Sequence, residues 1–263
     1  MKQASLALAL LAAAPGLAFA SGLTGQHALY DLTLSKVRTH DVTGATGQMS
    51  FDVVDGCTGW GTTQHMTLLI RNADGTLNKS VTDYITWETK DGKSLTFTLR
   101  ESDNDGKEQV DDAGSATHTM PNGAGVITYT TPAGTSLPLP PGTLFPMAHT
   151  EALLAAGRDG KKFIAPPLFD GTTSNGAQAT FIAILGHHGP EQNAFPALSP
   201  IPSADVDIAF YERKNTDSNP DFRTSMRYFE DGVATNLVLN FGDFMMTGRL
   251  KRLTIPSSPC GGK

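Results

Sequence analysis

The segment Leu-Thr-Phe-Thr-Leu-Arg-Glu-Ser-Asp-Asn-Asp-Gly, residues 95–106, contains the pattern that decides the fold. Leu95, Phe97 and Leu99 alternate with polar residues, which is the period of a β-strand with one buried face. Asp105-Gly106 follows shortly afterwards, and this dipeptide accepts the positive φ angles of a tight hairpin turn. The segment therefore predicts a half-buried strand that leads into an antiparallel hairpin.

The same pattern recurs from one end of the chain to the other. Further alternating apolar sets are Tyr30, Leu32 and Leu34; Met49, Phe51 and Val53; and Leu237, Leu239 and Phe241. Further turn dipeptides are Asp74-Gly75, Asp91-Gly92, Asn122-Gly123 and Asp231-Gly232. Repeated strands joined by tight turns predict an all-β protein arranged as an antiparallel meander.

One stretch breaks the two-residue period. A proline-rich extended run over 137–146 leads into residues 146–157, where Pro146 suits the first helical turn and Gly157 suits its end. This predicts one helix, whose apolar Met147, Leu153 and Leu154 would lie against or inside a curved sheet. Residues 186–203 contain His187, His188 and four prolines without periodicity and are expected to form a loop.

Strand patterns resume after the helix, over 162–165, 179–185 and several runs between 206 and 255. They continue the same sheet, so we expect one domain over residues 21–263. Its predicted architecture is a single curled antiparallel sheet, either a barrel or a strongly curled open sheet, with one inserted helix. A β-sandwich is the alternative.

The first 20 residues have the features of a secretory signal peptide. Lys2 gives a positive start, residues 4–14 are apolar, and Ala18-Phe19-Ala20 is a small-x-small cleavage site. The apolar run is shorter than the roughly 20 residues that cross a bilayer, and we expect no transmembrane segment elsewhere. The protein is therefore expected to be exported.

Charge excludes one broad class of ligand. The chain has 20 Lys and Arg against 26 Asp and Glu, a formal net charge of −6, and only 17% charged residues. Proteins that bind nucleic acids need a cationic surface, so no nucleic-acid partner is expected.

Two cysteines, Cys57 and Cys260, are present. In an exported chain an even number favours a disulfide, which would stabilise the fold by roughly 5 kcal/mol at most, since it closes a very long loop. A pair of free or catalytic thiols is the alternative, although redox enzymes usually place their cysteines in a C-x-x-C motif.

No constellation of catalytic residues stands out. His149 and Glu151 are two residues apart, so they point to different faces of the expected helix and His149 is expected to be structural. His187-His188 lacks the further ligands of a zinc site, and residues 103–108 lack the residue order of a calcium loop. We expect no enzyme activity, no catalytic residues, no metal and no cofactor, with a hydrolase that uses His149 as a weak alternative.

Two apolar sets suggest ligand binding instead. Five aromatic residues could form a platform on which a sugar stacks: Trp60, Tyr84, Trp87, Tyr129 and Phe145. Aromatic residues of this kind more often fill the interior of a barrel or cover its ends. A second set of apolar residues could line a cavity that holds a lipid chain: Met66, Leu68, Phe181, Ile184, Met245 and Met246.

The order of several short motifs resembles the EipB-type cell-envelope integrity family over almost all of the mature chain. The most specific motif is the run Leu139-Pro140-Pro141-Gly142-Thr143-Leu144-Phe145-Pro146-Met147-Ala148-His149. The others are Tyr30-Asp31-Leu32, Cys57-Thr58-Gly59-Trp60, Thr86-Trp87-Glu88, Phe169-Asp170-Gly171, Phe241-Gly242-Asp243-Phe244 and the terminal Cys260. Phe169 and Phe241 stand where the family pattern has Tyr.

The resemblance implies a periplasmic protein of Gram-negative bacteria without known catalysis, coiled as a spiral or broken barrel around a helix. It implies a Cys57–Cys260 disulfide and a role in envelope integrity through a protein partner, in particular a periplasmic tetratricopeptide-repeat protein. We expect a monomer with ligand or partner contacts at Trp60, Trp87, Phe145 and His149. The alternative function is a carrier of a lipid or lipoprotein acyl chain, by similarity of shape to lipoprotein carriers.

Overall fold

The structure is a computed structural model that describes residues 22–212 and 219–260. The expected signal peptide, residues 1–20, lies outside the described residues. The elements, in chain order, are β1 (Gln26–Val37), β2 (Val42–Asp55), β3 (Gly59–Asn72), β4 (Leu77–Thr89), β5 (Ser94–Ser102), β6 (Glu108–His118), β7 (Gly125–Thr131), β8 (Ser136–Leu139), α1 (Pro146–Arg158), β9 (Phe163–Ile164), β10 (Ala179–His188), the 3₁₀-helix η1 (Pro196–Leu198), β11 (Ser203–Tyr211), β12 (Phe222–Phe229), β13 (Ala234–Asn240) and β14 (Phe244–Thr254).

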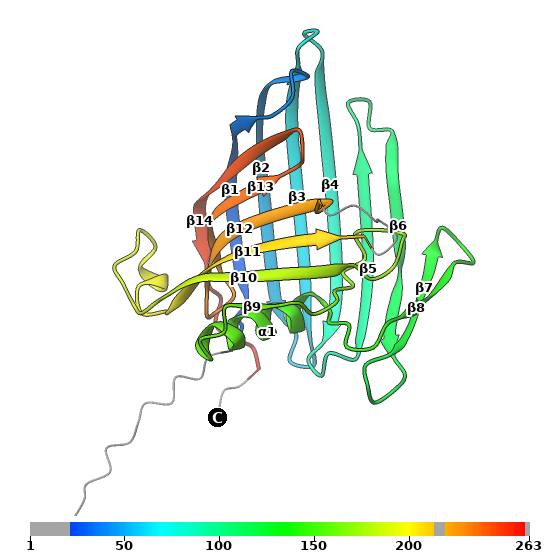
Figure 1. The fold of residues 1–263 in the computed structure, drawn as a ribbon, viewed down its shortest axis with the longest axis vertical. Helices are drawn as coiled ribbons and strands as arrows, with labels where there is room; N and C mark the ends of the chain where they lie inside the picture. Colours follow the sequence, from blue (N-terminus) through cyan, green and yellow to red (C-terminus); the bar gives the residue numbers. More distant parts are fainter. Residues whose placement is uncertain (1–21, 213–218, 261–263) are drawn as a thin grey trace, which may run out of the picture.

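The fourteen described strands form one antiparallel sheet that curls without closing. Its order is β8-β7-β6-β5-β4-β3-β2-β1-β14-β13-β12-β11-β10-β9, so the first and last strands pair in the middle and the two edge strands are consecutive in the chain. Figure 1 shows β10–β13 crossing in front of β1–β4, so the two halves of the sheet face each other. The predicted curled antiparallel sheet with one helix is confirmed.

The alternating pattern places its apolar residues as expected. In the β5–β6 pair, Leu95 lies opposite Ala116 and Phe97 opposite Gly114. The side chains of Leu95, Phe97 and Ala116 are all buried. Gly106 in the following turn has φ +73° and donates its N–H to the Asp103 carbonyl at 3.1 Å. The charged segment 103–107 therefore closes a hairpin, because its Gly adopts a left-handed conformation that other residues rarely take.

Helix α1 lies between the two halves of the sheet. It begins at Pro146, as predicted, and ends at Arg158. Leu153 and Leu154 belong to a core cluster that includes Ile182 and Val206 from one half and Trp60 from the other. Two further clusters fill the sheet around Leu32 and Phe229 and around Phe97 and Phe145.

The segment expected to be a loop over 186–203 is more ordered than predicted. β10 extends to His188, and η1 places Leu198 fully inside the cluster around Leu32. The burial of Leu198 could not be predicted from the sequence, because a single apolar side chain in an irregular segment rich in proline and glycine produces no periodicity.

Within the part of the chain that the structure describes, no helix has the length and apolar character needed to cross a membrane.

Candidate functional site

An apolar cavity of about 260 Å³ lies between the facing halves of the sheet. One wall comes from β1–β3 and the other from β12, β13 and the residues beside them. Large apolar residues in its lining include Met49, Phe51, Met66, Met226, Leu239 and Phe241. None of the described residues that line it is Asp, Glu, Lys, Arg or His. A concave, apolar site of this kind is typical of ligand-binding sites.

A second pocket of about 130 Å³ adjoins this cavity, and its lining residues include Gln26, Thr150 and Asp231. The two share Phe51, Tyr228 and Gly232 in their linings. The Thr150 hydroxyl of α1 lies 3.4 Å from the Tyr228 hydroxyl. The apolar cavity is therefore flanked, next to α1, by a pocket with polar side chains, which we call the polar end.

Gln26 is the most unusual residue at this polar end. Only 2% of its surface is exposed, and its Nε2 donates a 2.9 Å hydrogen bond to the carbonyl of Gly232. Its Oε1 has no hydrogen-bond partner among the described residues. An acceptor that is buried and unpaired costs free energy. Less than 1 Å² of this oxygen is accessible, so an atom inside the pocket does not contact it.

Glu88 fixes the start of α1 beside the cavity. Its Oε2 accepts the N–H of Met147 at 2.7 Å and its Oε1 accepts the N–H of Ala148 at 2.9 Å. These N–H groups have no partner within the helix, so a carboxylate from β4 takes the place of a local capping residue. Burial nevertheless raises the pKa of Glu88 to about 7. Sequence reasoning missed this role, because Glu88 lies 59 residues from Met147.

His149 is a buried structural residue on the same helix. Its Nε2–H donates to the Thr180 hydroxyl at 3.2 Å, and that hydroxyl donates to the Pro166 carbonyl at 2.5 Å. Burial lowers the pKa of His149 to about 4, so the ring is neutral near pH 7. Glu151 is exposed and makes no contact with the ring. The arrangement positions α1 and offers no base with an orienting carboxylate.

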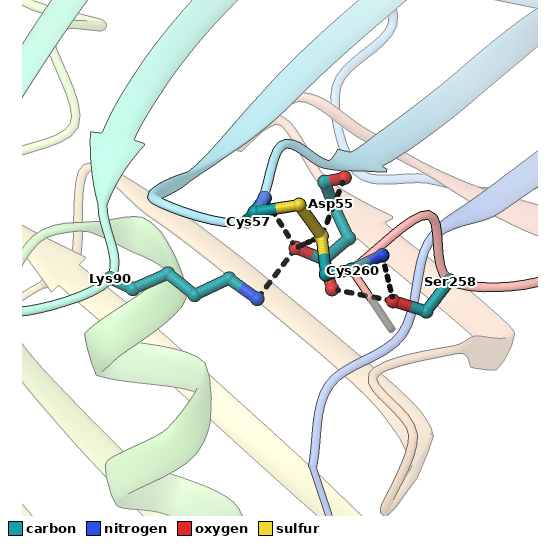
Figure 2. The surroundings of a disulfide bond; sticks show 5 residues. All are labelled: Asp55, Cys57, Lys90, Ser258 and Cys260. Atoms are coloured by element: carbon teal, nitrogen blue, oxygen red, sulfur yellow. Dashed lines mark hydrogen bonds and ion pairs between the residues drawn. A yellow bond between two sulfur atoms is a disulfide. The ribbon is translucent and has the colours of Figure 1, made fainter. Parts of the chain in front are cut away.

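The Cys57–Cys260 disulfide joins the end of the chain to the β2–β3 turn (Figure 2). Asp55 organises the surroundings: it accepts the N–H of Cys57 at 3.0 Å, pairs with Lys90 at 2.5 Å and accepts the Ser258 hydroxyl at 3.3 Å. Lys90 beside Asp55 holds the pKa of that carboxyl below its usual range. The bridge therefore attaches the segment after β14 to a turn that an ion pair already holds.

The four predicted contact residues do not form one site. Trp60, Phe145 and His149 are buried, whereas Trp87 is 39% exposed on the outer face. In the β3–β4 pairing Trp87 lies opposite Gly61, and its ring covers the adjacent backbone of Gly59. Of the four, Trp87 is the residue whose surface is available to a ligand or partner.

The sugar-stacking platform is not formed. Tyr84 and Tyr129 point inward with the buried Trp60 and Phe145, while Trp87 points outward. Tyr84 and Trp87 are an odd number of residues apart on one strand, and odd spacing places side chains on opposite faces. The five rings therefore cannot share a surface.

The predicted lipid-binding lining is also wrong in most of its members. Of the six residues, Met66 lines the cavity. Leu68, Ile184 and Met246 are buried in the core clusters. Phe181 is 43% exposed on the outer face, and Met245 is half-buried with its sulfur 3.6 Å from the Arg38 guanidinium. Apolar composition does not predict which of these residues line a cavity, because the strand register decides which side chains face inward.

Phe163, Phe181 and Leu185 form an exposed apolar surface that we call the edge patch. They are 60%, 43% and 68% exposed. Phe163 of β9 lies opposite Ala183 of β10, which stands between Phe181 and Leu185 on the same face. The two phenylalanine rings stack with centroids 5.6 Å apart.

His187 and His188 contact charged residues rather than each other. His188 Nε2 lies 2.8 Å from Asp205 and 3.2 Å from Arg227, and His187 lies 3.6 Å from Glu230. Among residues 22–212 and 219–260, no three His, Cys, Asp or Glu side chains gather closely enough to hold a metal ion.

The sheet is curled but open, a helix lies between its halves, and a cavity lies inside it. These features define a barrel-like protein with an interior cavity. The chain belongs to the EipB-like family, whose model matches residues 17–257. It is 28% identical over 253 residues to the cell envelope integrity protein EipB of Brucella abortus (strain 2308), covering 93% of this chain and 88% of that relative.

A solved structure shows the same fold. It is a β-barrel-like protein of a domain of unknown function from Brucella abortus, with a TM-score of 0.80 and 24% identity. The match covers 89% of this chain and 99% of the other.

Proposed function

We propose that this protein helps to maintain the integrity of the cell envelope from the periplasm, as a non-enzymatic protein that binds another protein. The 28% identical relative carries the name of a cell envelope integrity protein, and the two chains match over most of their lengths. A disulfide suits an oxidising compartment such as the periplasm. In this proposal the chain acts as one monomeric domain.

The edge patch is the observation that carries partner binding. Phe163, Phe181 and Leu185 expose large apolar surfaces side by side, and the next strand presents polar Asp205 and Asp207 beside them. An exposed apolar patch with a polar border is typical of a protein interface, because burying it releases ordered water. The partner class that we propose is a periplasmic tetratricopeptide-repeat protein.

Replacement of the edge patch tests this proposal. The double variant Phe181→Ser, Leu185→Ser should melt like the wild type, since both side chains are already in contact with water. In cells that lack the natural protein, it should fail to restore resistance to a bile-salt detergent. Leu77→Ser is the matched control, because Leu77 is 46% exposed at the start of β4.

A photo-crosslinking residue provides the second arm. Placed at position 185 it should give a discrete product with a second protein in the cell, and placed at position 77 it should not. Full resistance from the double variant at normal protein levels would contradict the proposed role of the edge patch.

Binding of an acyl chain is the second candidate function, and the cavity favours it. Its lining is apolar and lacks ionisable residues other than tyrosine among those described. Its volume, about 260 Å³, is near the lower end for ligand sites and suits one alkyl chain. Native mass spectrometry of gently purified protein should then show added acyl mass, and Met226→Trp, which fills the cavity, should remove it.

A further inference from the structure

The outer face of the sheet has a groove of about 630 Å³ that crosses strands β2 to β7, and we call it the outer groove. Its exposed side chains include Thr63, Ile85, Trp87, Thr96 and Thr130. None of the residues that line the interior cavity belongs to it, and the edge patch lies on β9 and β10. The outer groove is therefore independent of both proposed functions.

Trp87 covers three glycines in this groove. A Cβ on Gly59 would lie 2.5 Å from the indole, one on Gly56 would lie closer, and one on Gly61 would lie 3.5 Å away. The ring therefore fits against the backbone because Gly56 and Gly59 have no side chains. One side of the indole is held against the sheet, and its exposed surface faces the solvent.

Hydroxyl groups continue the groove beyond Trp87. Thr96 of β5 lies directly opposite Trp87, and Ser115 of β6 lies opposite Thr96. Side chains opposite each other on neighbouring strands have Cβ atoms about 5 Å apart, so these two hydroxyls follow the ring at regular intervals. Thr98 and Thr130 add two more. Among the described residues, none supplies a hydrogen-bond partner to these four hydroxyls, so they are available to a ligand.

The part of the lining that the structure describes carries no charged side chain and no histidine. A charged ligand would therefore find no opposite charge in the outer groove, and an anion would also be repelled by the net charge of −6. An entirely apolar ligand would cover the hydroxyls and leave them unpaired, which costs free energy. The lining therefore favours an uncharged ligand that combines apolar surface with many hydrogen-bonding groups.

Sugar rings have both properties. In a pyranose with equatorial hydroxyls, the C–H groups form a flat face, and their partly positive hydrogens are attracted to the negative face of an indole. The hydroxyls around the edge of the sugar ring exchange hydrogen bonds with Thr and Ser side chains. One exposed tryptophan beside a row of hydroxyls is enough for this kind of binding, so it does not require the five-ring platform.

We propose that the outer groove binds an uncharged β-1,4-linked oligosaccharide, with one pyranose ring stacked on Trp87 and further rings along Thr96 and Ser115. Neighbouring strands lie about 4.8 Å apart, so Ser115, two strands from Trp87, is about 10 Å away from it. A ligand with more than one sugar ring is therefore needed to contact both ends of this row.

Isothermal titration calorimetry of the oxidised protein with cellohexaose tests the proposal. Cellohexaose should bind, and its affinity should not change with salt concentration, because neither the groove nor the sugar is charged. Binding should also change the fluorescence of Trp87, which is distinguishable because Trp60 is buried. Absence of cellohexaose binding, or an affinity that falls steeply with salt, would overturn the proposal and leave partner binding and acyl binding intact.

Substitutions locate the binding in the outer groove. Trp87→Ala should weaken cellohexaose binding about tenfold, and Trp87→Phe, which keeps a smaller ring, should lose less. The double variant Thr96→Val, Ser115→Ala leaves the indole in place and should weaken binding about fivefold.

Thr117→Val is the matched control for the hydroxyl variant. Thr117 is exposed on the same face of β6 as Ser115 but does not line the groove, so its variant should bind like the wild type. Unchanged affinity of the double variant, or an equal loss in Thr117→Val, would overturn the proposal, and this comparison stands even if Trp87→Ala fails to fold.

Discussion

Glu88→Gln is expected to destabilise the protein in acid and to gain stability relative to the wild type as the pH rises to neutral and alkaline values. Glu88 is 2% exposed and accepts hydrogen bonds from the first N–H groups of α1. Glutamine has nearly the same shape as a protonated glutamic acid and carries no charge to desolvate, but its single carbonyl oxygen can accept only one of the two N–H groups. The substitution therefore removes the cost of the buried charge and also loses one capping hydrogen bond, which leaves a buried N–H without a partner at a cost of about 1–3 kcal/mol.

The magnitude follows from the pKa of Glu88, which burial raises from 4.5 to about 7. Between these values the folded protein holds the proton that the unfolded chain has released. The free energy of unfolding from this group therefore falls as the pH rises through this range, by about 3 kcal/mol in total. The free energy of unfolding of the variant relative to the wild type should therefore rise by about this amount between acid pH and pH above about 7.

His149 contributes with the opposite sign. Burial lowers its pKa from 6.5 to about 4, so between these values the unfolded chain binds the proton that the folded protein excludes. The free energy of unfolding from His149 therefore falls as the pH drops through the range, also by about 3 kcal/mol. The two contributions largely cancel in the wild type, and Glu88→Gln should reveal an increased sensitivity to acid.

Guanidinium unfolding of the oxidised proteins over about pH 4 to pH 8 measures the effect as a difference between variant and wild type. Glu108→Gln is the control, because Glu108 is exposed on β6 and its difference from the wild type should stay small. The reasoning is refuted if the free energy of unfolding of Glu88→Gln relative to the wild type does not rise between about pH 4 and about pH 8, since burial would then not disfavour the ionised carboxylate.

Three further predictions concern stability. Reduction of the Cys57–Cys260 bridge, which spans 203 residues, should lower the free energy of unfolding by up to about 5 kcal/mol, and identical melting with and without reductant would contradict this. His149→Leu should leave the contribution of Glu88 uncompensated, so that in pH-dependent melting the variant becomes more stable as the pH falls from about 7 to 4.5; an unchanged profile would count against a buried neutral ring. Gly59→Ala places a Cβ 2.5 Å from the Trp87 indole and 2.8 Å from the Glu88 carbonyl oxygen, and it should lower the free energy of unfolding, measured in denaturant, by about 1–3 kcal/mol. Gly22→Ala is the control and should change stability little, because no atom lies within 4 Å of its added Cβ; equal effects of the two substitutions would exclude steric crowding as the cause.

Local sequence patterns predicted the strands and the helix because both depend on short-range geometry. The alternation of Leu95, Phe97 and Leu99 with polar residues was enough to predict strand β5. The preference of proline for the first helical turn was enough to predict that α1 starts at Pro146. The curled sheet followed from continuity of the meander on both sides of the helix.

Long-range neighbours were not visible in the same way. Glu88 acquires its role because β4 passes the start of α1, and Gln26 is notable because its carbonyl oxygen meets no donor at close range. Neither residue has a local motif. Phe181 was predicted to line the cavity, but its apolar character alone does not show which side of the strand faces inward. A shift of one residue in strand register moves every side chain to the opposite face of the sheet.

The pairing of β1 with β14 has a consequence for how the protein is made. Synthesis delivers β1 first and β14 last, so one long side of β1 has no hydrogen-bonding neighbour until nearly the whole polypeptide exists. Such open strand sides attract other chains. A truncated polypeptide that ends before residue 244 would therefore be prone to aggregate. The last strand, β14, has eleven residues and completes the middle of the sheet, not one of its edges.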